Sequence, residues 1–331
     1  MKSFLILFFL SAFLLPEVQA QLDIDAFNKS RMANARVRTQ TEFTHDYVSG
    51  NPAARGHKST VTEFDNRGNI IRITNFNEAG RAISAVVYQY DARGNRVNFE
   101  RFNVTYDNNN REQRELRQSQ RTIFDARGNR TREHGFDGNS QYNNVFTYDA
   151  NGKLKEISYT TNNAVTERRQ FTHTGNRTEV TVLNASGAVT FRQTNTYDAN
   201  GLLLSEVRTN AQGATVSSLT MRYNNAGNII EEIKRRDNNV LEYQKNYTYD
   251  GSNRLTKIET TTSGGAKFVA NEYQYGAGGV LVLESWRRNE RTTRASTNKY
   301  TYDSRGLYTE KDSFFSTHNL NSLYKYQYEY F

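Results

Sequence analysis

The stretch Tyr197-Asp198-Ala199-Asn200-Gly201 decides the fold, because close copies of it recur along most of the chain. An Asp in the second place can accept a hydrogen bond from the backbone two residues further on, which starts a turn. A Gly in the fifth place supplies the positive φ of a type I turn followed by a G1 bulge, the geometry of a tight hairpin. Each copy therefore predicts a point at which the chain reverses. Copies include residues 64–68, 90–94, 124–128, 148–152, 223–227 and 302–306, and the positions assigned to the structural repeat are Tyr148, Asp149, Gly152, Tyr197, Asp198, Gly201, Tyr223, Gly227, Tyr249, Tyr302, Asp303 and Gly306.

The copies are evenly spaced. From Gly175 the last place of the motif recurs at 201, 227, 253, 279 and 306, in steps of 26, 26, 26, 26 and 27 residues. A second turn divides these units, because Gly187, Gly213, Asn239 and Gly265 each stand 12 residues after one motif glycine position and 14 before the next. Where Gly is missing from the motif, as at Asn253, Asn is the residue next best able to adopt a positive φ. The chain is therefore predicted to reverse every 12 to 14 residues.

The segments between the turns are predicted to be β-strands. They are about eight residues long and rich in Thr, Val, Ile and Tyr. Residues 241–249 alternate, with Leu, Tyr, Lys, Tyr and Tyr on one face and Glu, Gln, Asn and Thr on the other. Such alternation indicates antiparallel strands with one wet face. About twenty strands fit between residues 50 and 331, and a sheet that wide is expected to curl, split or close.

These observations predict an all-β fold, a long curled antiparallel sheet of about twenty short strands with its Tyr-rich face inside. We expect the motif aromatics to stack across the sheet as a ladder. The composition agrees, because 12% of the residues are aromatic and only 2 are Pro, whereas disordered segments are poor in aromatics. The chain has no Cys, so disulfides cannot stabilise it.

Residues 1–20 are predicted to be a cleaved signal peptide. Lys2 precedes a twelve-residue apolar run at 4–15, interrupted by Ser11, Pro16 ends the run, and Ala20 is a small residue at the cleavage point. The run is too short for a spanning helix, which needs about 20 residues, and no transmembrane helix is expected later in the chain. Residues 21–60 lack the repeat and are predicted to be an N-terminal cap or arm, and residues 61–331 form the hairpin-repeat domain. Export would place the protein in the periplasm, on the cell surface or outside the cell.

The repeat resembles a known class. Tyr-Asp-x-x-Gly followed by a basic residue or Asn and by Leu or Ile, as in residues 148–154, resembles the YD repeats of the RHS family. Runs such as Tyr88-Gln89-Tyr90-Asp91 strengthen the match, which covers roughly residues 60–331. The resemblance implies an exported bacterial β-protein that coils strips of hairpins into a shell, with roles in enclosing a toxin, contacting other cells or binding carbohydrate. The unit here is longer than the usual YD unit.

No catalytic or metal-binding arrangement is predicted. One Asp per turn is a weak ligand set for calcium, which takes six to eight oxygens, and turn initiation accounts for these Asp residues. Glu231 and Glu232 are expected to point to opposite faces of a strand, which disfavours their acting together on one sugar. No cofactor is implied, and the chain is predicted not to be an enzyme. The five His residues are scattered without zinc spacing, at His45, His57, His134, His173 and His318.

Two sets of residues are candidates for binding. The first is an aromatic platform for sugars with adjacent cations, formed by Trp286, Arg287 and Arg288, and the favoured alternative is that the aromatic ring packs in the core of the curled sheet. The second lies in an interval eight residues longer than a unit, between Gly94 and Gly128. As a binding site, this excess would be a projecting basic hairpin with Arg111, Arg114 and Arg117 that meets an anionic glycan or nucleic acid, and the favoured alternative is a solvated hairpin whose charges pair among themselves.

The sequence therefore predicts an exported, non-catalytic binding or structural module. Its expected partner is a surface polysaccharide or another envelope or secreted protein. Nucleic acid is not expected, because the net charge of +8 is spread along the repeats. Two alternatives stay open: an outer-membrane β-barrel, and a small RHS-like shell or chaperone associated with a secreted toxin. The outer-membrane alternative is disfavoured because many strands lack an apolar face.

Overall fold

The computed structural model describes residues 28–331, so the predicted signal peptide at residues 1–20 lies outside the described residues. A short helix at residues 28–34 precedes the strands. No helix in the described part of the chain is long and apolar enough to cross a membrane. The strands are β1 (Val37–Val48), β2 (Asn51–Pro52), β3 (His57–Phe64), β4 (Ile70–Phe76), β5 (Ala82–Tyr90), β6 (Arg96–Tyr106), β7 (Glu112–Phe124), β8 (Arg130–Asp137), β9 (Ser140–Tyr148), β10 (Leu154–Thr161), β11 (Ala164–Thr174), β12 (Arg177–Asn184), β13 (Val189–Tyr197), β14 (Leu203–Asn210), β15 (Thr215–Tyr223), β16 (Ile229–Arg236), β17 (Val240–Tyr249), β18 (Leu255–Thr262), β19 (Lys267–Tyr275), β20 (Leu281–Trp286), β21 (Ser296–Tyr302), β22 (Tyr308–Phe315) and β23 (Leu320–Tyr330). Two single-turn 3₁₀ segments lie at Asp237–Asn239 and Ala277–Gly279.

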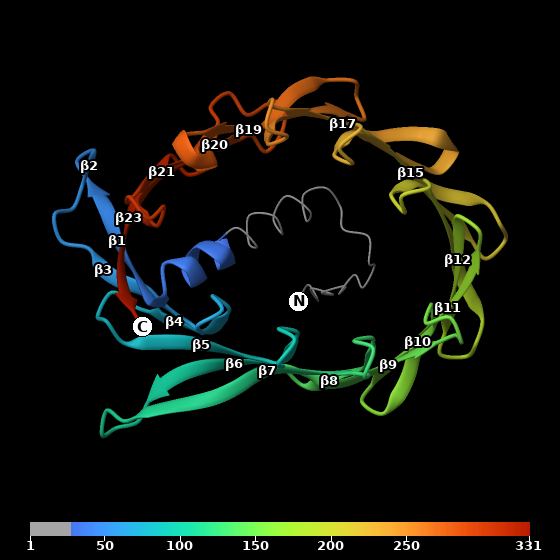
Figure 1. Ribbon diagram of the computed structural model, residues 1–331, viewed down its shortest axis with the longest axis horizontal. Coiled ribbons are helices and arrows are strands. Elements are labelled where there is room, and N and C mark those ends of the chain that lie inside the picture. Colours follow the sequence, from blue (N-terminus) through green and yellow to red (C-terminus); the bar gives the residue numbers. More distant parts are fainter. Residues whose placement is uncertain (1–27) are drawn as a thin grey trace.

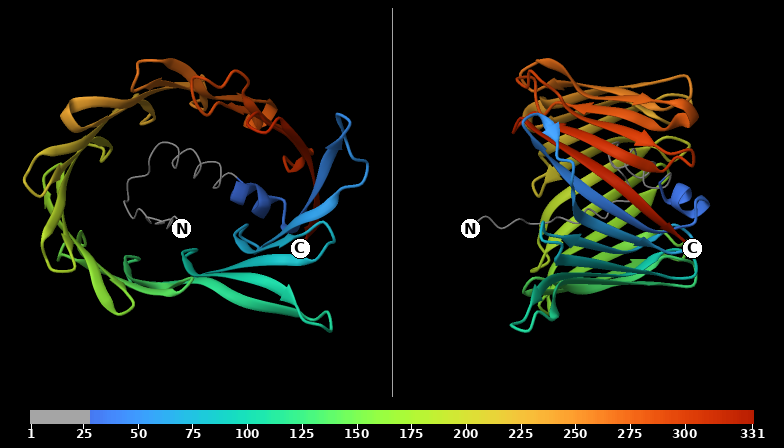
Figure 2. Two further views of the ribbon diagram at one scale, coloured as in Figure 1. Left: turned by 180° about the vertical axis from the view of Figure 1, so that it is seen from behind. Right: turned by 90° about the vertical axis from the view of Figure 1, so that its left-hand side faces the viewer.

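The sheet closes into a barrel. Each strand from β3 to β23 pairs antiparallel with the next, and β1 pairs with β3 on one side and with β23 on the other. The short strand β2 pairs only with the end of β1, so 22 strands form the wall. Figure 1 shows the resulting oval ring, and Figure 2 shows its strands inclined to the axis of the barrel. Closure leaves the wall without the edges that an open sheet exposes.

The prediction of a long curled antiparallel sheet, which left closure open, is thus refined to a closed barrel. The closing strand β1 comes from residues 21–60, the segment predicted to be a cap or arm. It lies beside β23 from Val37 opposite Tyr330 to Asp46 opposite Ser322. The predicted domain boundary at residue 60 falls inside β3. In the described part of this segment, the helix at residues 28–34 remains as a cap, and it lies at one mouth of the barrel (Figure 2).

The turns form as the motif predicts. The Oδ1 atom of Asp198 accepts hydrogen bonds from the backbone N–H groups of Asn200 at 2.9 Å and Leu202 at 2.8 Å. Gly201 has a φ of 83°, and Asn253 stands in for Gly with a φ of 60°. The same side-chain cap recurs in the other complete copies of the motif, and we call the end of the barrel where these turns lie the YD rim. The copy at residues 107–110 lies at the opposite end of the barrel, because it joins β6 to β7, whereas the turns on either side of it, at the YD rim, join β5 to β6 and β7 to β8.

The face that carries the YD tyrosines is the inner one. The helix lies within the ring in Figure 1, and its Met32 packs against Phe64 and Leu307. Tyr328 packs against this cluster, and the guanidinium of Arg31 lies 5.3 Å from the centre of the Tyr302 ring. The prediction of a Tyr-rich inner face is therefore confirmed. The opposite face of β23 is polar and exposed, with Lys325, Gln327 and Glu329.

The YD tyrosines are joined to neighbouring strands by hydrogen bonds. The Tyr223 hydroxyl donates to the backbone carbonyl of Leu203, the first residue of β14, at 2.8 Å. The expected stacking of successive motif rings is not how this ladder forms, because they stand on every second strand, about twice the ~4.8 Å strand spacing apart. Ring contacts form between adjacent strands instead, as between Tyr302 and Tyr308, whose centroids are 4.9 Å apart. The same hydroxyl-to-carbonyl bond, always to the first residue of a preceding strand, is made by Tyr90, Tyr148, Tyr249, Tyr275, Tyr302 and Tyr328.

A histidine takes the place of one tyrosine in this ladder. The Nε2 atom of His173 lies 2.8 Å from the carbonyl oxygen of Leu154, the first residue of β10, and its Nδ1 atom lies 3.0 Å from the hydroxyl of Thr178. His173 is half-buried. In the degenerate copy of the motif at residues 171–175, an imidazole near the end of β11 thus makes the contact that a YD tyrosine makes elsewhere.

The tyrosine ladder should make the barrel sensitive to alkali. Burial raises the pKa of Tyr223 from 10.0 to about 12, and it raises the pKa of Tyr90, Tyr148, Tyr275, Tyr302 and Tyr328 in the same direction. A raised pKa means that the folded protein holds the proton to higher pH than the unfolded chain does. The stabilisation is therefore complete below pH 10 and is lost as the pH rises toward 12. Circular dichroism and tyrosinate absorbance should change together in that range, and early ionisation without loss of structure would contradict the ladder.

Candidate functional site

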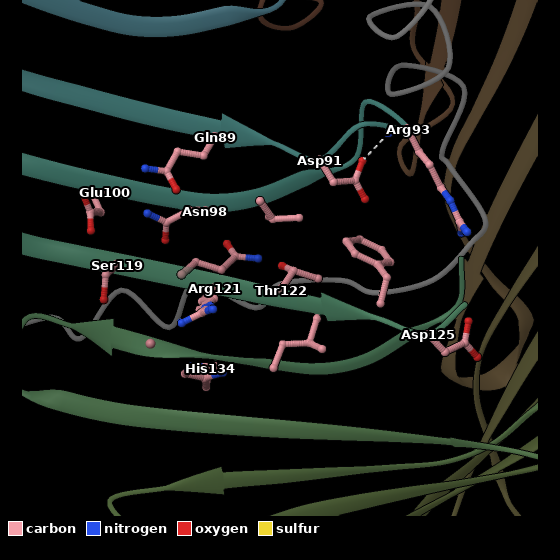
Figure 3. A pocket seen from close by; sticks show the side chains of 15 residues that line it. Gln89, Asp91, Arg93, Asn98, Glu100, Ser119, Arg121, Thr122, Asp125 and His134 are labelled. Atoms are coloured by element: carbon pink, nitrogen blue, oxygen red, sulfur yellow. Dashed lines mark hydrogen bonds between the residues drawn. The ribbon is translucent and has the colours of Figure 1, made fainter. Parts of the chain in front are cut away.

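A polar groove crosses four strands on the outer face of the barrel. Gln89 of β5 lies opposite Asn98 of β6, Asn98 lies opposite Arg121 of β7, and Arg121 lies opposite His134 of β8. These side chains point outward, because successive residues of a strand point to opposite faces of the sheet. Tyr88, which precedes Gln89, lies on the inner tyrosine face, so Gln89 lies on the outer face. Figure 3 shows the four side chains on successive strands, with Glu100 and Ser119 beside them. The groove holds about 800 Å³. We call these four residues the polar row.

The polar row keeps its hydrogen-bonding groups free. Within residues 28–331 the side chains of Gln89, Asn98, Arg121 and His134 make no hydrogen bond or ion pair, and the buried Nδ1 atom of His134 has no partner. Some comparable side chains elsewhere on the outer face are paired. Gln244 donates to Glu231 at 2.9 Å, for example. Four adjacent strands thus present unused donors and acceptors, which is the property expected of a binding surface.

The groove ends at the YD rim, where the charges are already engaged. The Oδ1 atom of Asp91 accepts hydrogen bonds from the N–H groups of Arg93 and Asn95, both at 2.9 Å. The hydrogen bond from the Asn95 side chain lowers the pKa of Asp91. The Arg93 guanidinium donates to the carbonyl of Ala126 in the next turn at 2.8 Å. The side chains of Asp91 and Arg93 therefore hold the turns at this end of the groove, and the polar row is the part of the groove that is free to contact a ligand.

The strands below the groove approach closely at Gly135. A Cβ atom there would lie 1.9 Å from the carbonyl oxygen of Ser119. On the inner side, the Tyr142 hydroxyl reaches across Gly135 to the same oxygen at 3.4 Å. Burial raises the pKa of Tyr142. Gly135 thus sets the spacing of β7 and β8, and with it the positions of Arg121 and His134.

Trp286 and its neighbours lie apart from this groove. Trp286 ends β20 and is half-buried, with its ring edge-on to Phe315 at a centroid distance of 6.2 Å. The backbone N–H of Arg287 donates to Ala270, and Arg288 is exposed in the loop at residues 287–295. The ring of Trp286 is therefore partly occupied by packing. In Figure 1, β20 lies across the ring from the hairpin that carries the other predicted set.

The predicted arginines of the long hairpin are ion-paired. Arg111 contacts Asp107 at 2.8 Å, Arg114 contacts Glu112 at 2.7 Å, and Arg117 contacts Glu115 at 2.6 Å. Such pairs between exposed side chains are worth little. The hairpin does project from the ring, as Figure 1 shows. The structure thus agrees with both the projection and the internal pairing of charges.

Buried carboxylates on the inner wall are a feature that sequence reasoning missed. Glu232 is only 1% exposed and accepts hydrogen bonds from the hydroxyls of Tyr243 at 2.5 Å and Tyr247 at 2.8 Å. Glu231 points to the outer face, so the predicted separation of these two carboxylates is confirmed. The signal was available in the repeat, because the fourth residue of β8, β14, β16 and β20 is Glu133, Glu206, Glu232 and Glu284 respectively.

These carboxylates are structural rather than reactive in their arrangement. Each is held by neutral donors or by one arginine, as Glu133 is by Arg130 at 2.8 Å. In β22 the equivalent place is Lys311, whose pKa burial lowers and whose Nζ atom lies 4.0 Å from the centre of the Tyr324 ring. Among residues 28–331 no three His, Asp or Glu side chains are grouped so that they could hold a metal ion. Buried polar groups with full sets of partners specify the packing of the wall.

A family model matches the repeat. Residues 155–330 match the Teneurin YD-shell family, and the chain belongs to that family. A porin-like protein from Bacteroides uniformis is similar in structure, with 9% identity and a TM-score of 0.31 over 89% of this chain and 97% of that one. A porin-like protein from Bacteroides vulgatus has 12% identity and a TM-score of 0.23 over 74% of this chain and 94% of that one.

A toxin complex also resembles this barrel. TcdB2-TccC3 has 12% identity and a TM-score of 0.31 over 88% of this chain, which spans only 20% of the toxin chain. No curated protein matches the sequence. Function depends on the residues of the site and not on likeness of fold.

Replacing Gly135 by Ala should distort the floor of the groove. The added methyl group cannot avoid the Ser119 carbonyl without moving β8, and such overpacking costs about 1–3 kcal/mol of unfolding free energy. Gly251→Ala is the matched control, because a Cβ atom there meets nothing within 4 Å. Chemical denaturation of both variants measures the difference, and equal stabilities would contradict the close approach of β7 and β8.

Proposed function

We propose that this protein is an exported, non-catalytic binding module that holds a surface polysaccharide in the groove across β5–β8. The observation that carries the proposal is the polar row, four side chains on adjacent strands with no partner inside residues 28–331. Strands lie about 4.8 Å apart, so the row offers a hydrogen-bonding group at each such step. A linear polymer with hydroxyl groups along its length suits that spacing.

The chemistry of the row favours a glycan over other polymers. The amides of Gln89 and Asn98 can both donate and accept, as sugar hydroxyl groups do. Arg121 is exposed and has no acidic partner in the described part of the chain, which suits a carboxylate on the sugar. Glu100 in the same groove can accept hydrogen bonds from sugar hydroxyl groups. We therefore propose a polysaccharide that carries carboxylates as well as hydroxyl groups.

The groove does not suit hydrolysis of the glycan. Glycoside hydrolysis generally needs two carboxyl groups that flank the scissile bond. Among the lining residues, Asp91 and Asp125 hold the backbone of their turns, which leaves Glu100. A binding role without turnover is the simpler proposal for this arrangement.

The outer wall suits an aqueous setting better than a lipid one. Ion pairs lie on its outer face at several places around the ring, including Arg222 with Glu231 at 3.3 Å and Lys325 with Glu310 at 3.2 Å. The Arg222 side chain is 69% exposed. A charged residue on the lipid face of a membrane barrel costs about 2–4 kcal/mol near the bilayer midplane. We therefore favour an aqueous location, in the periplasm, on the cell surface or outside the cell, over the outer-membrane alternative.

Retention on immobilised polysaccharides tests the groove directly. The mature protein should be retained on a polyuronate more strongly than on a neutral glucan. Arg121→Ala should weaken that retention by about tenfold, which corresponds to about 1.4 kcal/mol, because the cation that faces the carboxylate is lost. Arg222→Ala is the matched control, an exposed outer-face arginine outside the groove. Trp286→Ala tests the predicted aromatic platform in the same assay.

The outcomes separate the two candidate surfaces. Loss of binding in Arg121→Ala with full binding in Arg222→Ala supports the groove. Loss in Trp286→Ala alone would move the site to the loop at residues 287–295. Equal behaviour of all three variants, or no retention on any polysaccharide, would contradict the proposal, and release of shortened products would show an enzyme instead.

A further inference from the structure

The long hairpin of β6 and β7 carries an open strand edge. The last pairs that join it to its neighbours are Ser84 opposite Asn103 on the β5 side and Gln118 opposite Asp137 on the β8 side. Beyond these pairs β6 and β7 continue to pair with each other as far as Tyr106 and Glu112. Within residues 28–331 no strand pairs with residues 112–116 on the side away from β6, and all five are exposed. In Figure 1 this part of the hairpin projects from the ring.

The turn determines which backbone groups lie on that edge. The N–H of Asp107 donates to the carbonyl of Arg111 at 3.0 Å. Hydrogen-bonded and non-hydrogen-bonded pairs alternate along an antiparallel ladder. Gln113 therefore turns its backbone groups toward Thr105 of β6, and Glu112 and Arg114 turn theirs toward the open edge. Two consecutive edge-facing residues are enough to begin pairing with another strand.

The charges on this edge complement their own copy. Residues 111–115 read Arg-Glu-Gln-Arg-Glu. When two antiparallel copies are aligned on Gln113, each Arg111 faces the Glu115 of the second copy, and each Glu112 faces the Arg114 of the second copy. All four charged pairs are then of opposite sign, and Gln113 faces Gln113. This register also satisfies a two-fold axis perpendicular to the sheet, which keeps every residue on its own face.

We propose that two copies of this protein associate through the open edges of their long hairpins, in the antiparallel register centred on Gln113. In this register Glu112 of each copy exchanges backbone hydrogen bonds with Arg114 of the other copy. The backbone groups of these two residues are the ones that the hairpin leaves on its open edge. The contact is isologous, so it closes at two copies and does not grow into a fibre. The ion pairs within each hairpin, such as Arg114 with Glu112, are exchanged for pairs across the contact.

The opposing interpretation is that these charges protect the edge. Charged side chains on edge strands commonly prevent pairing with other chains. Protection requires only that charged side chains be present. Self-association requires in addition that positive and negative side chains follow one another in a particular order along the strand. The order Arg-Glu-Gln-Arg-Glu favours association, and a test that changes the order while keeping the number of charges separates the two interpretations.

Two reciprocal charge variants provide that test in the full mature chain. Arg111→Glu with Arg114→Glu makes the edge acidic, and Glu112→Arg with Glu115→Arg makes it basic. Each variant alone should associate at least about tenfold more weakly than the unchanged protein, because four opposite-charge pairs become like-charge pairs. A one-to-one mixture should associate again, because every pair across the contact is then of opposite sign. Sedimentation velocity over a range of protein concentrations at low salt measures all four samples.

A backbone variant separates pairing from simple charge attraction. Arg114→Pro removes a backbone N–H that faces the open edge and that takes no part in the hydrogen bonds between β7 and β6. The variant should therefore no longer associate, and its circular dichroism spectrum should be unchanged. An unchanged protein that stays monomeric at every concentration would overturn the proposal. Charge variants that self-associate as the unchanged protein does would overturn it as well. Neither result bears on polysaccharide binding, because the groove and residues 111–115 share no residue.

Discussion

The structure depends on one repeated constraint, the reversal of the chain at each Asp-capped turn. The carboxylate or amide oxygen in the second place of the motif holds two backbone N–H groups, and the residue in the fifth place adopts a positive φ. Because this geometry recurs at nearly equal intervals, every second strand begins at the same level of the wall. The YD tyrosines then reach the first carbonyl of a preceding strand, and the register of one hairpin is passed to the next. Even His173 keeps this connection.

A constant register also separates the two faces by function. The inner face holds tyrosines, cations stacked on aromatic rings and buried carboxylates such as Glu232, which two tyrosine hydroxyls bind. The outer face is wet, and a number of its charges pair locally. The polar row differs in bringing four unpaired side chains together on adjacent strands, and β7 carries an open edge. Both lie where the repeat is interrupted by the long hairpin, so one insertion accounts for both the groove and the contact surface that we propose.

Local features of the fold were predictable from the sequence, and long-range ones were not. Asp198 and Gly201 predict their turn because the interactions lie within five residues, and the alternation around Tyr243 predicts its faces. Closure was not predictable, because Thr41 meets Gln327 from the far end of the chain and neither residue carries a signal for the other. The polar row had no signal either, since Gln89 and His134 become neighbours only through two intervening strands. The resemblance to YD repeats indicates a shell, but it does not indicate which residues lie beside one another in the wall.

Closure of the wall between β1 and β23 is the central claim, and a chain without Cys makes it directly testable. Thr41 lies opposite Gln327, so Thr41→Cys with Gln327→Cys places two thiols on facing positions. Thr41→Cys with Ser322→Cys is the control, because Ser322 lies opposite Asp46. Mild oxidation followed by mass spectrometry should show an intramolecular disulfide in the first variant and not in the second. Free thiols in both variants, with the fold intact, would contradict a closed barrel.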